Sequence, residues 1–504
     1  MLQEKKEVFD YIVMGSGFGG LVCAALLAKE GYTVCVLEKN KQLGGALQSF
    51  GIEKKLFDAA VHYLGSLDEG KTLNKIFKYL HLDQVQKYKL NQFAFDEIVI
   101  GQKRFALAQG FELYQKQLIE KFPHEEQGII AFIQYMQQTV QDFPLYSLSF
   151  AQANKSKHVS ISLKTVVENF IQDELLRNIL MGNNILYAGH YDTLPFYVHA
   201  LISCSYIEGS YKFSQGSASL IKAIEKTIVT HRGLIKRNIE IKKIVAPKDQ
   251  VVYIEDQNGT QYKAQNYISN FHPLETYKIT TSPLLKKITT KRFEEAQNTI
   301  SCFMINLVLK EKLIVFQNTN SYFHKTQDVW RDTKMYDIED INSFAVYYNE
   351  DEKNKGYCDS MTILIYMPFS YFEKWESTYR TTSFPKQRND EYEIFKTTLV
   401  QNIIRQIEDW FPNLSQNIVK ADACTPLSYR DYLHTPQGSF YGIEKNINDF
   451  INSSISTKTK IPNLFLTGQN MNLHGVLGVS LSAILTASNF IPLEQLLKKI
   501  NTCS

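Results

Sequence analysis

The chain has 504 residues, of which 44% are hydrophobic and 21% are charged, and its 55 basic and 52 acidic side chains leave a net charge of +3. This composition excludes a disordered chain, and the balanced charge without a polybasic cluster disfavours nucleic acid as a partner. The length exceeds one ordinary hydrophobic core and predicts about three domain-sized units, which can be built from interleaved segments.

Seven cysteines are scattered along the chain without a Cys-x-x-Cys pair, which disfavours a disulfide framework or a structural zinc site. No His-Glu-x-x-His motif or short His/Cys spacing indicates another metal site. The N-terminus lacks an apolar signal core, and the apolar stretch at residues 475–491 is too short to cross a bilayer. We therefore expect a cytoplasmic protein with reduced cysteines.

The first predicted elements are a strand at residues 9–14 and a helix at residues 21–28. Three glycines stand in the turn between them: Gly15, Gly17 and Gly20. The first permits a tight turn, the second lets backbone approach a pyrophosphate, and the third lets the helix pack closely on the strand. A second strand, residues 33–37, leads to Glu38, about 20 residues beyond the glycines, where a carboxylate accepts hydrogen bonds from an adenosine ribose. This order of elements predicts a dinucleotide site rather than a βαβ unit without a nucleotide.

The middle of the chain changes from a helical to a strand pattern. Apolar residues recur at three- and four-residue spacing in residues 111–138 and 166–180, which predicts an inserted helical lobe. Strand character returns over residues 239–271 around the turn candidate Asn258-Gly259. This pattern predicts a hairpin that belongs to the nucleotide domain.

The last third of the chain mixes strands and helices. Strands at residues 302–309 and 361–366 and a helix at residues 389–410 predict a second, substrate-facing piece. A strand at residues 463–469 then leads to Gly475 and an apolar helix. We expect this helix to be buried and to return the chain to its first sheet.

The predicted fold class is α/β, with a Rossmann-like dinucleotide-binding domain built from discontinuous segments and an interleaved α+β substrate domain. The expected segments are 1–70 (N-terminal βαβ unit), 71–200 (inserted, mainly helical substrate lobe), 201–290 (return to the dinucleotide-binding domain), 291–420 (sheet and helix of the substrate domain) and 421–504 (C-terminal part of the dinucleotide-binding domain).

These segments together resemble the FAD-dependent phytoene desaturase, carotenoid isomerase and retinol saturase superfamily, and most closely its saturase-like (all-trans-retinol 13,14-reductase-like) branch. The similarity covers nearly the whole chain. It is strongest at the N-terminal glycines, at residues 57–65, at Gly216-Ser217 before an apolar helix, and at residues 466–475. The glycines alone would indicate only a large flavoprotein clan, whereas His62-Tyr63 and residues 472–475 narrow the resemblance.

The resemblance implies FAD as the cofactor and assigns residues to its parts. Gly15, Gly17 and Gly20 would bind the pyrophosphate and Glu38 the adenosine ribose. Gly44 and Gly45 would lie beside the isoalloxazine, and the backbone of Ile241 would meet adenine. The Gly468 region would approach the pyrophosphate and ribityl chain, and a helix that begins near Gly475 would aim its N-terminus at the flavin pyrimidine ring. The other residues implied to bind the cofactor are Lys39, Gln469, Val476, Leu477, Gly478 and Val479.

Two positions depart from the family pattern. Asn470 stands where relatives commonly have an acid, and Gln215 replaces the first member of a frequent Gly-Gly pair. An asparagine can hydrogen-bond a ribityl hydroxyl but without charge assistance, so we expect a weaker affinity for flavin.

The candidate catalytic residues are His62, Tyr63 and His474, because the family-like segments would bring them to the flavin face. Tyr206 and Tyr211 are weaker candidates. Polar sequence surrounds other histidines, which we expect to be solvated, among them His124, His158 and His231. The aromatic run at residues 369–375 could line an apolar tunnel, but ordinary packing is the favoured interpretation.

The function that the resemblance implies is an FAD enzyme that acts on a C=C bond of a polyene, carotenoid, retinoid or other isoprenoid-like apolar substrate. We expect a saturase, in which reduced flavin delivers a hydride to one carbon and an acid protonates its neighbour. His62, Tyr63 or a bound water is the expected proton source.

Four other functions stay open at this stage: a desaturase, a cis-trans isomerase, a flavin amine oxidase, and an isoprenoid-lipid carrier without redox chemistry. No second glycine motif for a nicotinamide nucleotide is found in the sequence, so the electron donor is not identified. For an apolar substrate we expect transient contact between the protein and a membrane surface.

Overall fold

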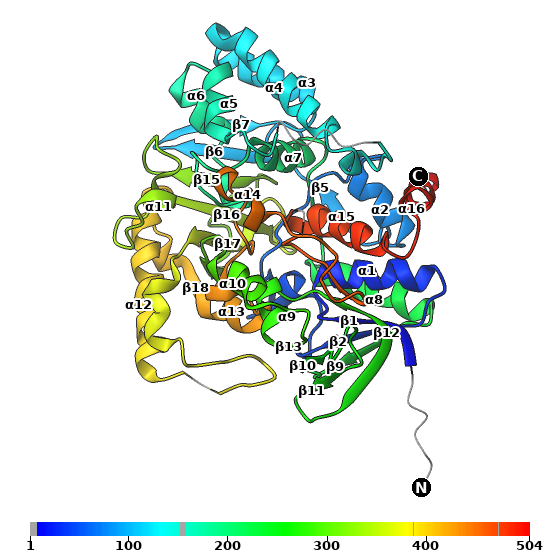
Figure 1. The fold of residues 1–504 in the computed structure, drawn as a ribbon. Helices are drawn as coiled ribbons and strands as arrows, with labels where there is room; N and C mark the ends of the chain where they lie inside the picture. The colour runs from blue at the N-terminus through cyan, green and yellow to red at the C-terminus, as the bar shows by residue number, and fades with distance from the viewer. Residues whose placement is uncertain (1–7, 152–157, 387, 472, 504) are drawn as a thin grey trace.

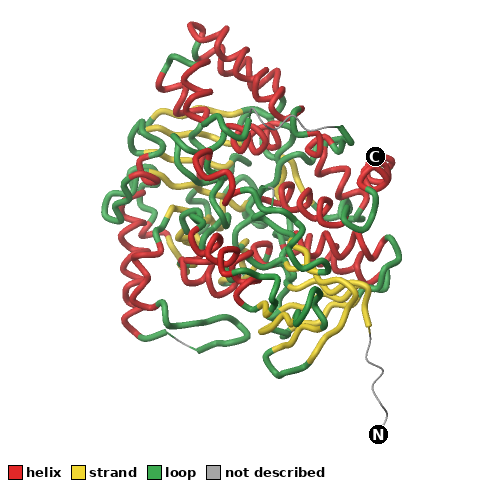
Figure 2. Tube along the Cα trace, viewed as in Figure 1, coloured by secondary structure: helices red, strands yellow, loops and turns green. Residues whose placement is uncertain are grey.

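The computed structural model describes residues 8–151, 158–386, 388–471 and 473–503 (Figure 1). Two large β-sheets and the helices that surround them make up most of the described chain (Figure 2). The predicted α/β class, with its Rossmann-like part assembled from discontinuous segments, is confirmed by the order of the strands.

The first sheet has the strand order β13-β10-β11-β12-β1-β2-β9, and β19 pairs with β12. Its strands are β1 Val8–Met14, β2 Val34–Glu38, β9 Leu234–Arg237, β10 Ile241–Val245, β11 Tyr253–Asp256, β12 Gln261–Ser269, β13 Thr280–Thr281 and β19 Leu464–Leu466. Strands β2, β1, β12 and β19 run parallel, whereas β11 is antiparallel to both β10 and β12. The predicted hairpin and the predicted return of the C-terminal strand to this sheet are therefore confirmed.

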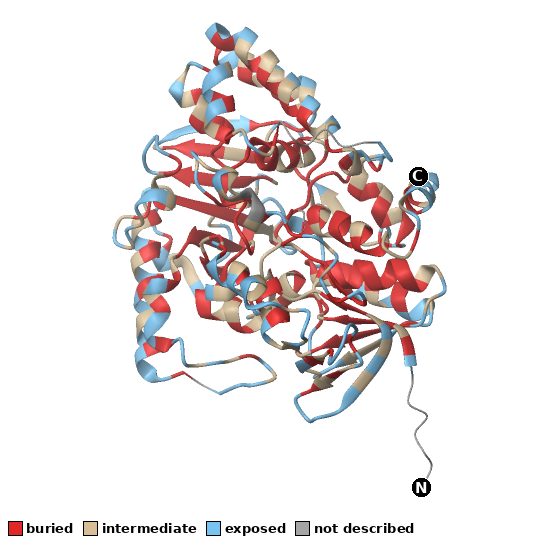
Figure 3. Ribbon diagram, in the orientation of Figure 1, coloured by how far each residue is buried: buried red, intermediate tan, exposed pale blue. Residues whose placement is uncertain are grey.

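Buried helices cover this sheet (Figure 3). Helix α1 packs between α8 and α15, and α2 and α16 pack farther along α15. These helices are α1 Phe18–Lys29, α2 Thr72–Tyr79, α8 Ala218–Thr230, α15 Gly475–Ala487 and α16 Leu493–Thr502. The prediction that the apolar stretch after Gly475 forms a buried helix is confirmed.

The second sheet has the order β18-β14-β17-β16-β15-β6-β7 and is antiparallel except between β15 and β6. Its strands are β6 Asp96–Ile100, β7 Lys103–Leu107, β14 Cys302–Leu309, β15 Asn320–His324, β16 Ser343–Glu350, β17 Cys358–Tyr366 and β18 Ile418–Cys424. Helix α12 Asp390–Ile407 and the 3-10 helix η5 Phe369–Trp375 share one hydrophobic cluster with this sheet. The aromatic run at 369–375 is therefore ordinary packing, as favoured above.

The inserted lobe contains helices α3 Phe111–Lys121, α4 Glu126–Gln141, α5 Leu163–Phe170, α6 Glu174–Leu180 and α7 Phe196–Ile207 (top of Figure 1). Each predicted helical span is two helices, because Pro123 interrupts the first and Asp173 caps a new helix in the second. The segment also supplies β6 and β7 to the second sheet, so a mainly helical description of residues 71–200 is incomplete. Each of these strands has five residues and begins with two charged ones, so it is too short and too mixed to show a strand periodicity.

The remaining elements are shorter connections. The strands are β3 Ser49–Ile52, β4 Lys55–Asp58, β5 Lys87–Lys89 and β8 Tyr211–Phe213, paired as β3-β4 and β5-β8. The helices are α9 Pro273–Lys278, α10 Lys287–Glu295, α11 Arg331–Lys334, α13 Pro426–Leu433 and α14 Phe450–Ser453.

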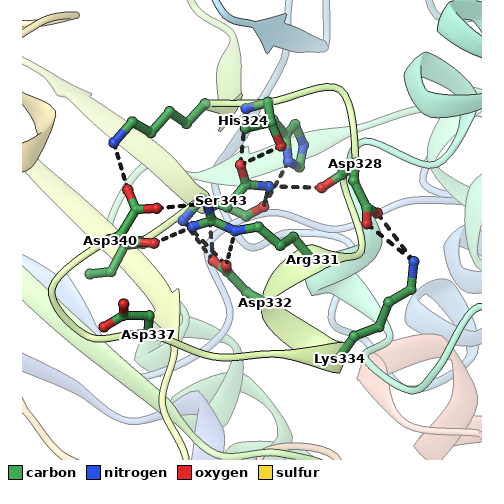
Figure 4. Close-up of polar contacts among 12 residues, drawn as sticks. His324, Asp328, Arg331, Asp332, Lys334, Asp337, Asp340 and Ser343 are labelled. Carbon is green, nitrogen blue, oxygen red and sulfur yellow. Dashed lines mark hydrogen bonds and ion pairs between the residues drawn. The ribbon is translucent and has the colours of Figure 1, made fainter.

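A polar network stabilises the loop between β15 and β16 (Figure 4). The buried Asp332 carboxylate accepts the backbone N–H groups of Asn342 at 3.0 Å and Ser343 at 2.9 Å, and it pairs with Arg331. Burial raises the pKa of Asp332. The loop also fixes the segment around Asn184, because the Val329 carbonyl accepts a 2.8 Å hydrogen bond from the Asn184 side chain.

We expect Asp332→Ala to lower the free energy of unfolding by about 3 kcal/mol, since it strands two buried backbone donors and leaves Arg331 paired with Asp340 alone. Lys334→Ala is the matched control, because it removes only an exposed ion pair with Asp328 and should cost less than about 1 kcal/mol. Urea denaturation of both variants measures the difference. Equal effects would show that the Asp332 network does not support the loop.

Candidate active site

A groove runs along the carboxyl ends of β1, β2 and β12 and encloses about 1340 Å³, part of it open to solvent. Most of the residues assigned to the cofactor line it: Gly15, Gly17, Glu38, Lys39, Gly44, Gly45, Ile241, Gly468, Gln469, Gly475, Val476 and Val479. The sequence assignments therefore converge on one elongated groove.

Gly20, Leu477 and Gly478 do not line this groove. A Cβ atom on Gly20 would lie 2.5 Å from the Gly15 carbonyl oxygen, so this glycine allows α1 to pack against the turn. Leu477 and Gly478 line a second cavity, described below.

Backbone segments approach one another closely at the glycine turn. Gly15 has a φ of +91°, and a Cβ atom on Gly17 would lie 2.5 Å from the amide nitrogen of Asn270. A Cβ atom on Gly468 would lie 2.7 Å from the amide oxygen of the same side chain. Asn270, which also lines the groove, thus joins the first and last turns of the sheet. The sequence offered one signal for it, a polar residue directly after a buried strand.

Glu38 lies at the end of β2 and is only 6% exposed. One carboxylate oxygen accepts the Ser16 N–H at 2.9 Å and the Ser16 hydroxyl at 2.6 Å, and the other accepts the Asn40 N–H at 2.8 Å. These bonds fix the carboxylate and leave acceptor capacity on the second oxygen. Lys39 beside it donates to the Asp431 carbonyl at 2.8 Å, and burial lowers its pKa.

The two departures from the family pattern have structural explanations. The Asn470 side-chain oxygen accepts the Ile443 N–H at 2.8 Å, so it serves the fold and only the amide nitrogen is left for a ligand. The Lys445 ammonium donates to the Asn470 carbonyl at 3.2 Å, and burial lowers the Lys445 pKa to about 8. Gln215 is exposed, whereas Gly216, at φ +68°, occupies the crowded position of the pair.

A second cavity adjoins the groove and encloses about 440 Å³, part of it open to solvent, and Gly475 and Val476 at the start of α15 line both. Its wall is mostly apolar and aromatic: Leu64, Leu73, Tyr146, Leu186, Leu201, Ile202, Tyr206, Leu473 and Leu477, with Gly65, Ser205, His474 and Gly478. The described residues that line it include no carboxylate. The start of α15 is therefore the boundary between a dinucleotide groove and an apolar cavity.

His474 is placed at this boundary. It is the N-cap residue of α15, and its ring stacks on that of Tyr441 with 3.9 Å between centroids. Its Nε2 lies 2.9 Å from the Leu186 carbonyl, and the Tyr441 hydroxyl donates to the Ile185 carbonyl at 2.8 Å. Burial lowers the pKa of His474 to about 4, so the ring is neutral near pH 7.

His62 and Tyr63 line neither the groove nor the cavity. The His62 ring stacks on Tyr347 at 4.0 Å, and burial, with a smaller effect from Lys212, lowers its pKa to about 3. Because an imidazole with this pKa is neutral near pH 7, His62 does not provide an imidazolium acid. The Tyr63 hydroxyl instead donates to the Asp96 carboxylate at 2.8 Å, and its ring lies 4.5 Å from that of Tyr206.

Other candidates have different surroundings from those expected. His158 is fully buried with Nε2 2.6 Å from an Asp142 oxygen, so the expectation that it is solvated was wrong. Polar neighbours in the sequence do not reveal such a buried partner. Tyr211 donates to Asp68 at 2.9 Å and lines neither space. Asn472, part of the segment that narrowed the resemblance, lies outside the described residues.

Asp96 is the polar residue that sequence reasoning missed. Its carboxyl is fully buried at the start of β6, and burial raises its pKa to about 7. A carboxylate that opens an apolar strand was the available signal.

In the part of the chain that the structure describes, no helix could span a membrane, and no group of three His, Cys, Asp or Glu residues could hold a metal ion.

The glycine turn, the fixed carboxylate and the groove define a Rossmann-like dinucleotide-binding protein, and residues 13–80 match the family model "NAD(P)-binding Rossmann-like domain". The chain is 26% identical to the all-trans-retinol 13,14-reductase of Danio rerio, over 96% of this chain and 86% of that protein. It is 22% identical to the chloroplastic prolycopene isomerase of Daucus carota, over 96% and 80%. The resemblance expected from the sequence is therefore confirmed, since relatives of this chain include retinol reductases and prolycopene isomerases.

Solved structures share the fold over nearly the whole chain. The CLA-producing fatty acid isomerase from P. acnes aligns with a TM-score of 0.62 at 13% identity, covering 96% of this chain and 99% of that one. The two relatives named above are a reductase and an isomerase, so the expected enzyme class is also confirmed.

The buried neutral histidine predicts a pH dependence of stability. Unfolding restores the ordinary His62 pKa of about 6.5, so the unfolded chain binds a proton as the pH falls below that value while the folded chain binds it only near pH 3. Stability therefore falls as the pH falls, by about 2 kcal/mol at pH 5 from His62 alone. We expect His62→Phe to remove this contribution to the loss of stability between pH 7.5 and pH 5, as measured by urea denaturation at the two pH values. His124→Phe, at an exposed position, is the control, and an equal change in both variants would refute the assignment.

Proposed function

We propose that the protein is an FAD-dependent oxidoreductase that saturates a C=C bond of a polyene, retinoid or other isoprenoid-like apolar substrate. The observation that carries this proposal is the shared wall at Gly475 and Val476, where the dinucleotide groove meets the apolar cavity. A flavin ring at that wall and an apolar chain in the cavity would lie in contact. The similarity to a retinol reductase over 96% of the chain supports the same substrate class.

The residues of the groove fit FAD along its length. The glycine turn offers close backbone approach and the N-terminus of α1 to a pyrophosphate, and Glu38 offers a fixed acceptor to a ribose. At the other end, the N-terminus of α15 offers free N–H groups and a partial positive charge to the flavin ring. When bound, FAD would supply hydride transfer.

The protein's own residues would orient the substrate and exclude water. Leucine and isoleucine side chains of the cavity bury an apolar chain, and the stacked His474 and Tyr441 rings close the wall beside α15. Segment 184–186 fixes both rings through its carbonyl groups. Because His62 and His474 are neutral near pH 7, the space around the substrate carries no imidazolium charge.

A cis-trans isomerase acting on the same substrate class is the second candidate, because the chain is also similar to a prolycopene isomerase over 96% of its length. An amine oxidase is less well supported, since the described residues that line the cavity include no carboxylate to bind an ammonium group.

We expect Glu38→Gln to weaken FAD binding about 10- to 100-fold, because a neutral amide replaces charge-assisted hydrogen bonds to the ribose. Glu255→Gln, which removes a carboxylate from a surface pair with Lys243, should leave the affinity unchanged. The flavin content of the purified proteins and a fluorescence titration with FAD provide the comparison. Equal affinities in both variants would place the adenosine elsewhere.

The reaction is tested by reducing the flavin-loaded protein anaerobically and analysing a panel of polyenes by mass spectrometry. With reduced flavin, a saturase gives products two hydrogens heavier and an isomerase gives products of equal mass. A desaturase gives lighter products only in a parallel sample whose flavin is left oxidised, because the flavin must accept the electrons. We expect Ile202→Trp, which fills the cavity, to lower kcat/KM at least about tenfold without loss of flavin, whereas Ile394→Trp at an exposed position should not. No product from any polyene would refute the proposal.

A further inference from the structure

A buried polar cluster lies behind the apolar cavity and joins five side chains from four parts of the chain. The Asp96 carboxyl on β6 accepts hydrogen bonds from the Tyr63 hydroxyl at 2.8 Å, the Asn320 amide at 3.0 Å and the Asn183 amide at 3.3 Å. The Tyr63 hydroxyl also lies 2.7 Å from that of Tyr322. All three donors to Asp96 are neutral groups.

The surroundings of Asp96 favour a carboxyl group that carries a proton at moderate pH. Burial raises its pKa to about 7, and the hydrogen bonds from the three donors only partly offset this effect. The titratable groups that face it from the neighbouring elements are tyrosines, each with a pKa raised by burial: Tyr63, Tyr114, Tyr206, Tyr322 and Tyr347. These tyrosines stay neutral while Asp96 titrates.

The cluster reaches the cavity through one ring. Tyr206 lines the cavity, and its ring lies 4.5 Å from that of Tyr63 at a tilt of 31°. The histidines first considered as acids are neutral near pH 7, with pKa values lowered to about 3 for His62 and about 4 for His474. Of these groups, Asp96 is the one that changes charge near neutral pH.

We propose that Asp96 and Tyr63 form an internal acid pair that supplies one proton, through Tyr206, to a substrate in the apolar cavity. This inference rests on the proposed function, in which one alkene carbon accepts a hydride from reduced flavin. The other carbon takes the Tyr206 hydroxyl proton. Tyr63, whose ring packs against Tyr206, replaces that proton when the two hydroxyls come within hydrogen-bonding distance, and the Asp96 carboxyl replaces the proton of Tyr63. Asp96 is left as a carboxylate stabilised by Asn183 and Asn320, and a proton that enters the cavity from solvent returns to it through Tyr206 and Tyr63 before the next turnover.

In this scheme Tyr206 is the catalytic residue and Asp96 is a positioning residue that acts through Tyr63. The matched variants are Asp96→Asn, which keeps the shape of the side chain, and Glu97→Gln, which removes the next carboxylate on β6, paired with Arg104 outside the cluster. Tyr63→Phe interrupts the same pair without changing any carboxyl group.

Infrared titration of the protein without substrate tests the acid pair independently of turnover. We expect a carboxylic acid C=O band with a midpoint near pH 7 in the wild type and in Glu97→Gln. Asp96→Asn should lack this band, and Tyr63→Phe should shift its frequency. A band that titrates below pH 5, or one that Tyr63→Phe leaves unchanged, would overturn the proposal.

The pH profile of polyene reduction provides the second readout. The wild-type rate should fall as the pH rises through about 7, because the acid form is consumed, whereas Asp96→Asn should be about 100-fold slower with no such fall. Should Asp96→Asn fail to fold, Tyr63→Phe is expected to show the same loss. The proposal would be overturned if folded Asp96→Asn or folded Tyr63→Phe showed the same rate and the same pH dependence of polyene reduction as the wild type. A wild type inactive on every polyene would refute the proposed function, and the infrared titration would still decide whether the pair exists.

Discussion

The close approach of backbone at the glycine turn is the constraint on which the rest of the site depends. Gly17, Gly20 and Gly468 lie where a Cβ atom would come within 2.5 to 2.7 Å of Asn270 or of the Gly15 carbonyl. A Cβ atom on Gly19 would lie 2.9 Å from the Gly468 Cα atom, so glycine lets the first and last turns of the sheet meet backbone to backbone beside Asn270. Their meeting brings helix α15 beside α1 and so places Gly475 at the end of the groove.

The position of α15 then determines what chemistry can occur. One side of its N-terminus faces a groove suited to a charged dinucleotide, and the other faces an apolar cavity. The nearby histidines are held neutral by burial, and the buried Asp96 carboxyl is shared with tyrosines and amides. An apolar substrate can therefore lie beside the cofactor without facing an unpaired charge.

The local part of this site could be predicted from the sequence. Gly15, Gly17, Gly20 and Glu38 lie within one βαβ unit, so their spacing alone indicates a shared function. The apolar helix after Gly475 could be recognised by its composition, and the family resemblance placed it at the same groove. The fold class followed from the order of the strand and helix patterns.

The surroundings of the substrate could not be predicted in this way. Asp96 and Tyr322 come from different parts of the chain, and the pairing of β6 with β15 brings them together. Asn183 reaches Asp96 from the segment that follows α6. Burial lowers the pKa of His62, but a sequence does not reveal how deeply a histidine adjacent to a groove is buried. Tyr206 was a weaker catalytic candidate in the sequence, because its place in the cavity depends on the packing of α7, which the sequence does not reveal.

The most direct measurement is a crystal structure of the protein with FAD and a conjugated isoprenoid ligand. We expect the flavin ring at the N-terminus of α15 and a double bond of the ligand within about 3.5 Å of it, in the cavity beside Tyr206. A ligand bound away from this cavity, or a groove that takes up no flavin, would contradict the claim that the start of α15 brings cofactor and substrate together.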